Sequence, residues 1–191
     1  MRSFAYLALL ASAAVATPAL AQEAAAPFTG PRVEGIVGWD RTQAGGHDDG
    51  ALYGIGAGYD VQAGPAIVGV ETELNDSSAK ECVGAATSTD PRLCAKAGRD
   101  IYAGGRVGTV VGGSTLLYAK AGYTNGRYKL TSDAGADSTV VDSTNLDGVR
   151  VGAGVEHAVG PNSFLKAEYR YSNYEQGVER HQALAGFGFR F

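Results

Sequence analysis

The sequence has little of what helical and nucleic-acid-binding proteins depend on. It contains one Met and one Trp against 28 Gly and 10 Tyr in 191 residues, and an interior helical Gly costs about 1 kcal/mol relative to Ala, which disfavours a helix bundle. Its 16 basic residues are outnumbered by 20 acidic ones, so no basic surface for nucleic acid is expected. Beyond residue 21 no apolar run is long enough for a spanning helix. A single β domain is therefore predicted.

The first residues have the pattern of an export signal. Arg2 precedes an apolar run over residues 4–15, and Ala19-Leu20-Ala21 provides a small-residue cleavage site. Cleavage between Ala21 and Gln22 is predicted, which makes 1–21 a signal peptide, 22–31 an N-terminal lead and 32–191 the folded domain. A short membrane-anchor helix is the alternative, and the shortness of the run counts against it.

Hydrophobic and polar residues alternate with period 2 along the mature chain, the pattern of a strand with two different faces. Such strands are expected to be close to the 9–11 residues that a tilted strand needs to cross a bilayer. Eight segments carry the pattern: 32–40, 51–62, 66–75, 100–110, 115–125, 146–157, 164–172 and 179–191.

One face of these segments has no charged residue, whereas the other holds eight acids and eight bases. The uncharged face includes Trp39, Tyr59, Tyr123, Tyr169, Tyr171, Phe189 and Phe191, which fit the aromatic girdles of a membrane barrel. The charged face holds Glu34, Asp40, Asp60, Glu71, Glu73, Asp100, Glu156, Glu168, Arg32, Arg106, Lys120, Arg150, Lys166, Arg170, Arg180 and Arg190.

Alternation alone fits a soluble lipocalin-like barrel or an outer-membrane barrel with the faces reversed. Three features favour the membrane barrel. The chain carries an export signal, and long loops at 41–50, 76–99 and 126–145 alternate with short turns at 63–65, 112–113 and 160–162. Glycines also share the charged face, where a narrow eight-stranded lumen needs small residues, at Gly54, Gly56, Gly58, Gly104, Gly108, Gly152, Gly154, Gly186 and Gly188.

Several motifs resemble the eight-stranded outer-membrane barrel family that includes the OmpA transmembrane domain and the opacity-type surface proteins. They are Gly-Ile-Gly-Ala-Gly-Tyr-Asp at 54–60, Val-Gly-Ala-Gly-Val-Glu at 151–156, Lys-Ala-Glu-Tyr-Arg-Tyr at 166–171 and the ending at 180–191. The resemblance implies a location in the cell outer membrane of a Gram-negative bacterium, among its lipids and lipopolysaccharide. It also implies that Phe191 is the residue read by the barrel-assembly machinery.

The lumen charges are expected to pair, because an isolated buried charge costs several kcal/mol. Glu71 or Glu73 is predicted to pair with Arg106 and Lys120, and Glu156 or Glu168 with Arg150, Lys166 and Arg170. The predicted network also includes Glu34, Asp60, Arg180 and Arg190. A paired network fills the barrel and favours a structural role, with a narrow channel for ions or small solutes as the alternative.

Two cysteines lie in the longest predicted loop, at Cys82 and Cys94. In an exported protein they are expected to form a disulfide, because a zinc site would need more ligands nearby. The chain has three His, and Ser172 and His181 are predicted on opposite faces, so a lipid A-modifying enzyme is the weaker alternative. No catalytic residue, metal or cofactor is assigned.

The sequence therefore predicts an all-β, closed eight-stranded antiparallel up-and-down transmembrane β-barrel. Its expected function is non-enzymatic: envelope integrity and the presentation of surface loops, whose ligands the sequence does not identify. The expected partners are membrane lipids, lipopolysaccharide and the assembly machinery, and not nucleic acid.

Overall fold

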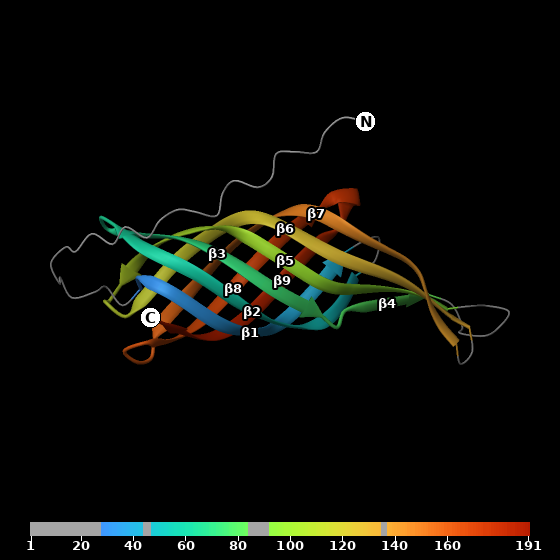
Figure 1. The fold of residues 1–191 in the computed structure, drawn as a ribbon, viewed down its shortest axis with the longest axis horizontal. Helices are drawn as coiled ribbons and strands as arrows, with labels where there is room; N and C mark the ends of the chain where they lie inside the picture. Colours follow the sequence, from blue (N-terminus) through green and yellow to red (C-terminus); the bar gives the residue numbers. More distant parts are fainter. Residues whose placement is uncertain (1–27, 44–46, 84–91, 135–136) are drawn as a thin grey trace, which may run out of the picture.

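In the computed structural model, residues 28–43, 47–83, 92–134 and 137–191 are described (Figure 1). The predicted signal peptide and its cleavage site lie outside them. Among the described residues, no helix has the length and hydropathy to cross a membrane. The elements are β1 (Gly30–Gln43), β2 (His47–Ala63), β3 (Ala66–Ser77), β4 (Lys80–Val83), β5 (Arg92–Val111), β6 (Thr115–Ala134), β7 (Asp137–Ala158), β8 (Ser163–Tyr174), the short 3-10 turn η1 (Glu175–Gly177) and β9 (Glu179–Arg190).

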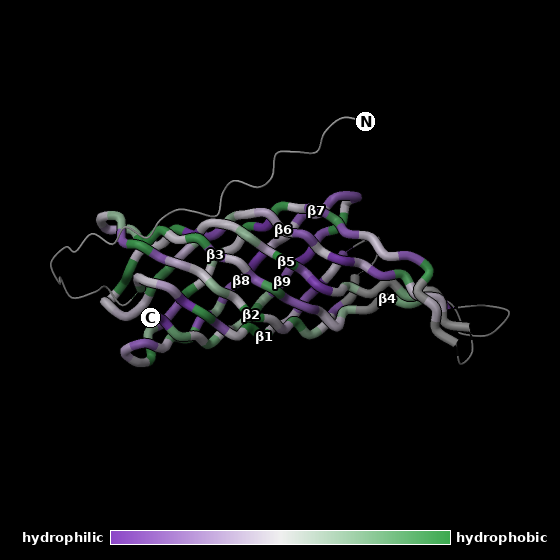
Figure 2. The backbone as a smooth tube through the Cα atoms, viewed as in Figure 1, coloured by the Kyte–Doolittle hydropathy of each residue, from purple (hydrophilic) through white to green (hydrophobic). Residues whose placement is uncertain are grey.

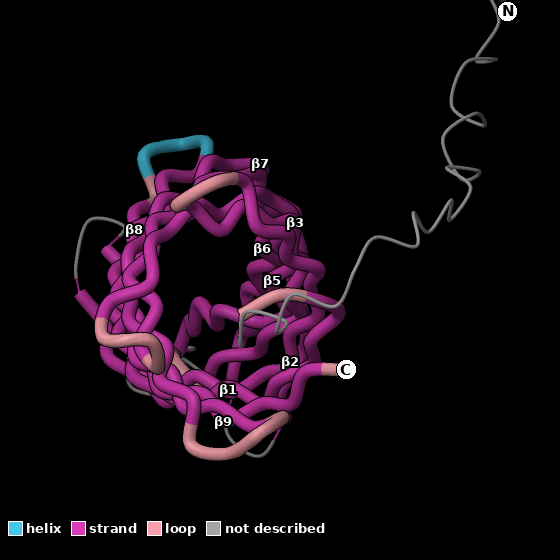
Figure 3. Tube along the Cα trace, turned by 90° about the vertical axis from the view of Figure 1, so that its left-hand side faces the viewer, coloured by secondary structure: helices cyan, strands magenta, loops and turns pink. Residues whose placement is uncertain are grey.

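Eight long antiparallel strands close into a barrel, as predicted. Each wall strand pairs with the next one along the chain, and β9 pairs with β1 to close the barrel. The short β4 pairs with the outer part of β5, and β3 pairs directly with the rest of β5. A row of register partners that starts at Arg41 passes once around the wall and returns to β1 at Pro31, ten residues earlier. The shear number is therefore 10, and the strands must tilt relative to the barrel axis, which Figure 1 shows. Viewed end on, the strands form a closed ring (Figure 3).

The two ends of the barrel differ. At the short-turn end, β2 meets β3, β5 meets β6 and β7 meets β8 through tight connections, with left-handed backbone at Gly64, Gly112 and Gly113. The C-terminus lies at this end, opposite β4 (Figure 1). At the other, extended end, β5, β6 and β7 run on beyond the other strands. The short turns use Gly64, Gly112 and Gly113 because residues other than glycine rarely adopt the positive φ angles found there.

The long segments predicted as loops contain strand, which corrects the expected boundaries. Most of 126–145 belongs to β6 and β7, and 92–99 begins β5, which pairs with the unpredicted β4. Together β4 and the outer parts of β5, β6 and β7 form a sheet that we call the ribbon, covering 80–83, 92–99, 126–134 and 137–147. Polar composition hid these strands, because their few buried residues, such as Cys94, Ala97 and Leu146, produce no regular hydrophobic alternation.

The first strand begins two residues before the predicted start of the folded domain at residue 32. β1 begins at Gly30, and Phe28 is fully buried inside the short-turn end of the barrel. There Phe28 packs with Ile67 and Leu116, and its carbonyl oxygen accepts a hydrogen bond from Arg190 Nη1 at 3.0 Å. A single aromatic residue before a strand has no periodicity, so this contact could not be predicted from the pattern.

The outer face of the barrel wall is apolar and exposed. Val37, Ile55, Val70 and Val149 each have more than 60% of their surface exposed, while the charged residues between them are buried. Figure 2 shows hydrophobic and hydrophilic residues mixed along the strands instead of gathered in one region. An apolar outer face around a polar interior is the reverse of a soluble barrel and matches one that lies in lipid.

Candidate functional site: the charged lumen

All sixteen charged residues of the predicted polar face are buried inside the barrel, each at most 6% exposed. Their formal charges cancel, with eight acids against eight bases. They come from all eight strands of the barrel wall, so the network joins every part of the wall. Buried charges are stable only when paired and hydrogen-bonded. How these groups pair therefore decides what the lumen is able to do.

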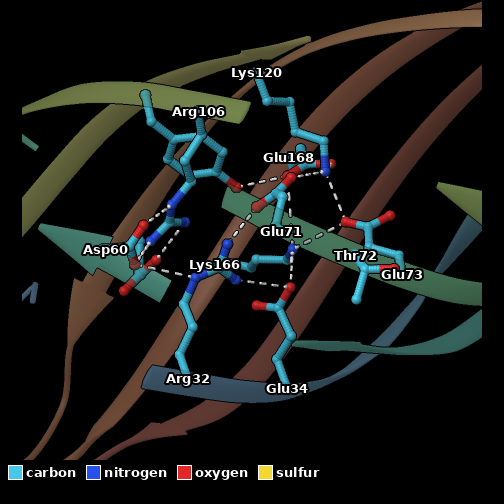
Figure 4. A network of polar contacts seen from close by, with 12 residues as sticks. Arg32, Glu34, Asp60, Glu71, Thr72, Glu73, Arg106, Lys120, Lys166 and Glu168 are labelled. Atoms are coloured by element: carbon cyan, nitrogen blue, oxygen red, sulfur yellow. Dashed lines mark hydrogen bonds and ion pairs between the residues drawn. The ribbon is translucent and has the colours of Figure 1, made fainter. Parts of the chain in front are cut away.

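Two acids organise the lumen near the short-turn end. Asp60 accepts hydrogen bonds from Arg106 Nη2 at 2.6 Å, from Arg190 Nη1 at 2.8 Å and from Arg32 Nε at 3.1 Å. Glu156 accepts from the same Arg106 and Arg190 at 3.0 and 2.5 Å. Three guanidinium groups thus surround two carboxylates, and Figure 4 shows Arg32 and Arg106 converging on Asp60.

The middle of the lumen is centred on Lys120 and Glu73. The Lys120 ammonium lies 2.6 Å from both Glu71 and Glu73 and 3.1 Å from Glu168. Glu73 also pairs with Arg170. One lysine therefore contacts three carboxylates on two opposite walls, which ties β6 to β3 and β8 (Figure 4).

A second lysine extends this middle layer toward β1. Lys166 Nζ donates to Glu34 Oε1 at 2.6 Å and lies 3.6 Å from Glu168. Arg32 lies 3.2 Å from the same Glu34 oxygen and also pairs with Glu71. The middle layer is thereby joined to the layer around Asp60.

A third layer lies toward the extended end. Arg180 pairs with Asp40, and its Nη1 lies 3.0 Å from Asp100. Arg150 lies 2.8 Å from Asp100 and 3.8 Å from Glu73, so it connects this layer to the middle one. The cations and anions therefore form one continuous network through the barrel.

Some pairs differ from those predicted. Arg106 binds Asp60 and Glu156 and not Glu71 or Glu73, and Arg150 binds Asp100 and not Glu156 or Glu168. A glycine explains the first case. Gly69 separates Asp60 from Arg106 in one row of register partners, and a Cβ atom on Gly69 would collide with the Asp60 carboxylate, which lies over this glycine and meets Arg106.

Glycines elsewhere make the same kind of room, as predicted from their place on the charged face. A Cβ atom on Gly56 would lie 2.7 Å from the Glu34 carboxylate, and one on Gly58 would lie 2.9 Å from the Arg32 guanidinium. Both distances are shorter than real Cβ contacts. Glycine at these positions therefore leaves room for the charged side chains, and at Gly58 the carbonyl oxygen of Val70, 2.8 Å from such a Cβ atom, also limits the space.

Apolar clusters fill both ends of the lumen. Phe28, Ile67, Leu116 and Tyr118 form one at the short-turn end, where Phe164 is also buried. The other lies at the extended end and contains Leu146, Tyr174 and Val178. Two lumen tyrosines, Tyr102 and Tyr118, were missed by the sequence analysis, although they share the phase of the charged residues.

The remaining predicted residues lie outside the lumen. Cys82 and Cys94 are register partners in β4 and β5 of the ribbon and form a disulfide, with Cα atoms 4.1 Å apart. Phe191 follows β9 and is exposed, and its backbone N–H bonds Pro31 O at 3.0 Å. The disulfide therefore joins β4 to the outer part of β5 within the ribbon.

The histidine and serine considered for catalysis do not meet. Ser172 faces the lumen and its hydroxyl accepts a hydrogen bond from Arg150 Nε at 2.8 Å. His181 faces outward, where its Nδ1 lies 2.7 Å from the Tyr169 hydroxyl. In the described ranges, no three His, Cys, Asp or Glu residues are grouped as metal ligands would be.

This fold and lumen define a class of protein. A closed antiparallel barrel with an apolar outer face, aromatic residues on that face and a filled, charged interior is a transmembrane β-barrel. The chain matches the model of the outer membrane protein beta-barrel domain over residues 7–191, and it belongs to that family.

Similar proteins agree with this assignment. The chain is 31% identical over 155 residues to a 22 kDa outer membrane protein of Rhizobium leguminosarum bv. viciae, covering 73% of this chain and 67% of the relative. Its fold is similar to Neisserial surface protein A (TM-score 0.59, 21% identity, 85% and 98% of the two chains). It is also similar to Ail of Yersinia pestis (TM-score 0.56, 19% identity, 85% and 99% of the two chains).

The protein is thus located in the outer membrane. In such barrels the short turns face the periplasm, so the extended end and its ribbon face outside.

Proposed function

We propose that this protein is a non-enzymatic barrel that supports the envelope and presents the ribbon at the cell surface. The observation that carries the proposal is the filled lumen: sixteen balanced charges, paired across every wall, lie between two apolar clusters. A barrel stabilised in this way is a rigid base for a surface structure. In this proposal residues 1–21 direct export, Phe191 is read during assembly, and the disulfide keeps the ribbon folded outside the cell.

Planar-bilayer recording tests the filled lumen. We expect no conductance from inserted protein across a range of salt concentrations, whereas steady single-channel currents would establish the narrow channel instead. Phe28→Ala is the matched variant, because it removes a plug residue without removing a charge. Currents that arise in this variant alone would support the plug in the parent protein.

Mass spectrometry of lipid A from cells that overexpress the protein tests the absence of enzymatic activity. We expect an unchanged spectrum, and a new acylated or deacylated species would overturn that part of the proposal. Limited proteolysis of intact cells tests surface presentation. We expect cleavage within the ribbon, at sites such as Lys129, and none in the barrel strands.

A further inference from the structure

The lipid-facing wall is hollowed on one side, where an apolar groove of about 830 Å³ crosses β9, β1, β2, β3 and β5. Its lining includes the small residues Gly35, Ala57 and Thr72. A Cβ atom added to Gly35 would have no neighbour within 4 Å. The Thr72 hydroxyl donates to Tyr102 O at 2.9 Å, so its hydrogen-bonding capacity is used inside the wall. The groove is therefore an apolar surface against which a hydrocarbon chain can pack.

The groove is inclined across the membrane. It reaches from Phe189 on β9 to Ile101 on β5. The row of register partners that begins at Phe189 passes through β1, β2 and β3 to Ala103. Ala103 lies two residues from Ile101 along β5, on the side of the short-turn end. Because the shear makes each row climb from β1 toward β2 and β3, the groove rises from the periplasmic side to the outer interface. This is the direction of an acyl chain in the outer leaflet.

Cationic side chains lie above the upper end of the groove. Arg99 is exposed two residues beyond Ile101, at an irregularity where the β5 register shifts between Ala97 and Asp100. Arg127 lies across that irregularity on β6, and the only hydrogen bond of its side chain among the described residues is a long one of 3.5 Å from Nη2 to the Ser143 hydroxyl.

These cations have no anionic partner. Within the part of the chain that the structure describes, neither Arg99, Arg127 nor the exposed Lys129 forms an ion pair, whereas Arg41 on β1 is paired bidentately with Asp49. The backbone register also sets Lys96 opposite Lys129 and Lys80 opposite Lys96. The positive charge of Arg99 and Arg127 is therefore available to an anionic ligand at this edge of the barrel.

We propose that the groove and these cations form one binding site for a phosphorylated, acylated lipid of the outer leaflet. One acyl chain lies over Gly35, Ala57 and Thr72, and the phosphate is held by Arg99 and Arg127. Arginine suits this role because its planar group binds phosphate through paired hydrogen bonds. The site depends on the location in the outer membrane and on neither the closed lumen nor the surface role proposed above.

Native mass spectrometry of the refolded full chain in detergent tests this site. The probes are diphosphoryl lipid A and, for the same chain chemistry without a net anionic headgroup, phosphatidylethanolamine. We expect one lipid A to remain bound and phosphatidylethanolamine to be lost. The double variant Arg99→Gln/Arg127→Gln is expected to weaken lipid A binding about tenfold or more, the effect of losing one or two charge-assisted hydrogen bonds.

Gly35→Leu, which fills the groove, is expected to weaken it to a similar extent. Ala57→Leu serves the same purpose if that variant does not fold. The matched controls are Arg41→Gln, a rim arginine outside the site, and Ala153→Leu, on the opposite wall. Both are expected to bind lipid A as the parent does.

The proposal is wrong if lipid A is not retained, if phosphatidylethanolamine is retained equally, or if the controls lose binding as strongly as the site variants. Inorganic pyrophosphate distinguishes a whole lipid from a free phosphate. Displacement of lipid A by pyrophosphate at equal concentration would assign the cations to soluble anions and overturn the lipid site. Heat-modifiable migration of each variant in detergent verifies that the barrel is folded. Because none of these readings depends on conductance or surface presentation, they separate failure of this site from failure of the proposed function.

Discussion

The lumen and the ribbon use charged residues in opposite ways. Inside the barrel every cation lies against at least one carboxylate, and Lys120 alone contacts three. On the ribbon and its base, Arg99, Arg127 and Lys129 form no ion pair with any described residue. Position in the lumen is fixed by charge pairing among buried side chains, whereas position in the ribbon is fixed by backbone hydrogen bonds and one disulfide.

Desolvation explains this difference. A charge in the lumen has lost its water, so removing one partner leaves the other uncompensated. A charge on the ribbon remains hydrated and needs no partner, so the register there is free to place like charges together. The same substitution should therefore have different consequences in the two regions, and the following variants test that contrast.

Loss of a lumen carboxylate should have the largest effect. Glu73→Gln removes a charge that Lys120 contacts at 2.6 Å and that also pairs with Arg170. We expect about 3–5 kcal/mol of destabilisation, typical of breaking a buried ion pair, measured as a lower urea midpoint for unfolding in detergent. The control is Asp49→Asn at the exposed pair with Arg41, which should change the midpoint far less. Equal shifts would mean that the lumen charges are not desolvated.

A positive charge on the lipid face should come next. Val151 and Val141 are both exposed, at 48% and 58%, but Val151 lies on the barrel wall and Val141 on the ribbon. Val151→Arg should destabilise insertion by about 2–4 kcal/mol if it lies near the bilayer midplane, whereas Val141→Arg meets water and should assemble normally. Heat-modifiable migration after folding into liposomes measures both. Normal assembly of both variants would argue against a lipid-facing wall.

Glycine substitutions should have a smaller effect and should depend on the face. A Cβ atom on Gly58 would lie 2.8 Å from Val70 O and 2.9 Å from Arg32, while one on Gly35 would meet nothing within 4 Å. Gly58→Ala is expected to cost about 1–3 kcal/mol through overpacking, and Gly35→Ala to be neutral or slightly stabilising. Urea titration distinguishes them, and equal midpoints would contradict the account of glycine as room for lumen charges.

Much of the barrel could be predicted from the sequence, because its strands have two different environments. Alternation of lipid and lumen faces places Val37 outside and Glu34 inside with no knowledge of neighbouring strands. The ribbon could not be predicted in this way, because its few buried residues, such as Ala97 and Leu146, give no period-2 alternation and the polar pattern of 126–145 resembles a loop.

The identity of ion-pair partners is the part of the site that sequence reasoning could not supply. Which strands meet follows from chain order, but which residues face across the lumen depends on the shear and on side-chain reach. Arg106 reaches Asp60 only because Gly69 lies between them. Burial of Phe28 likewise depends on the shape of the barrel mouth and leaves no periodic signal.

Removal of the disulfide should have the smallest effect on the barrel. Cys82 and Cys94 join β4 to the outer part of β5, away from the charged lumen. Regions with few buried contacts open independently of the rest of a protein, so Cys82→Ser/Cys94→Ser should leave the urea midpoint of the barrel nearly unchanged. Tryptic cleavage after Arg92 or Lys96 should become faster, and the parent protein under reducing conditions should behave in the same way. A large fall in the urea midpoint would mean that the ribbon and the barrel unfold as one cooperative unit, and the contrast between the two regions would then be one of charge alone.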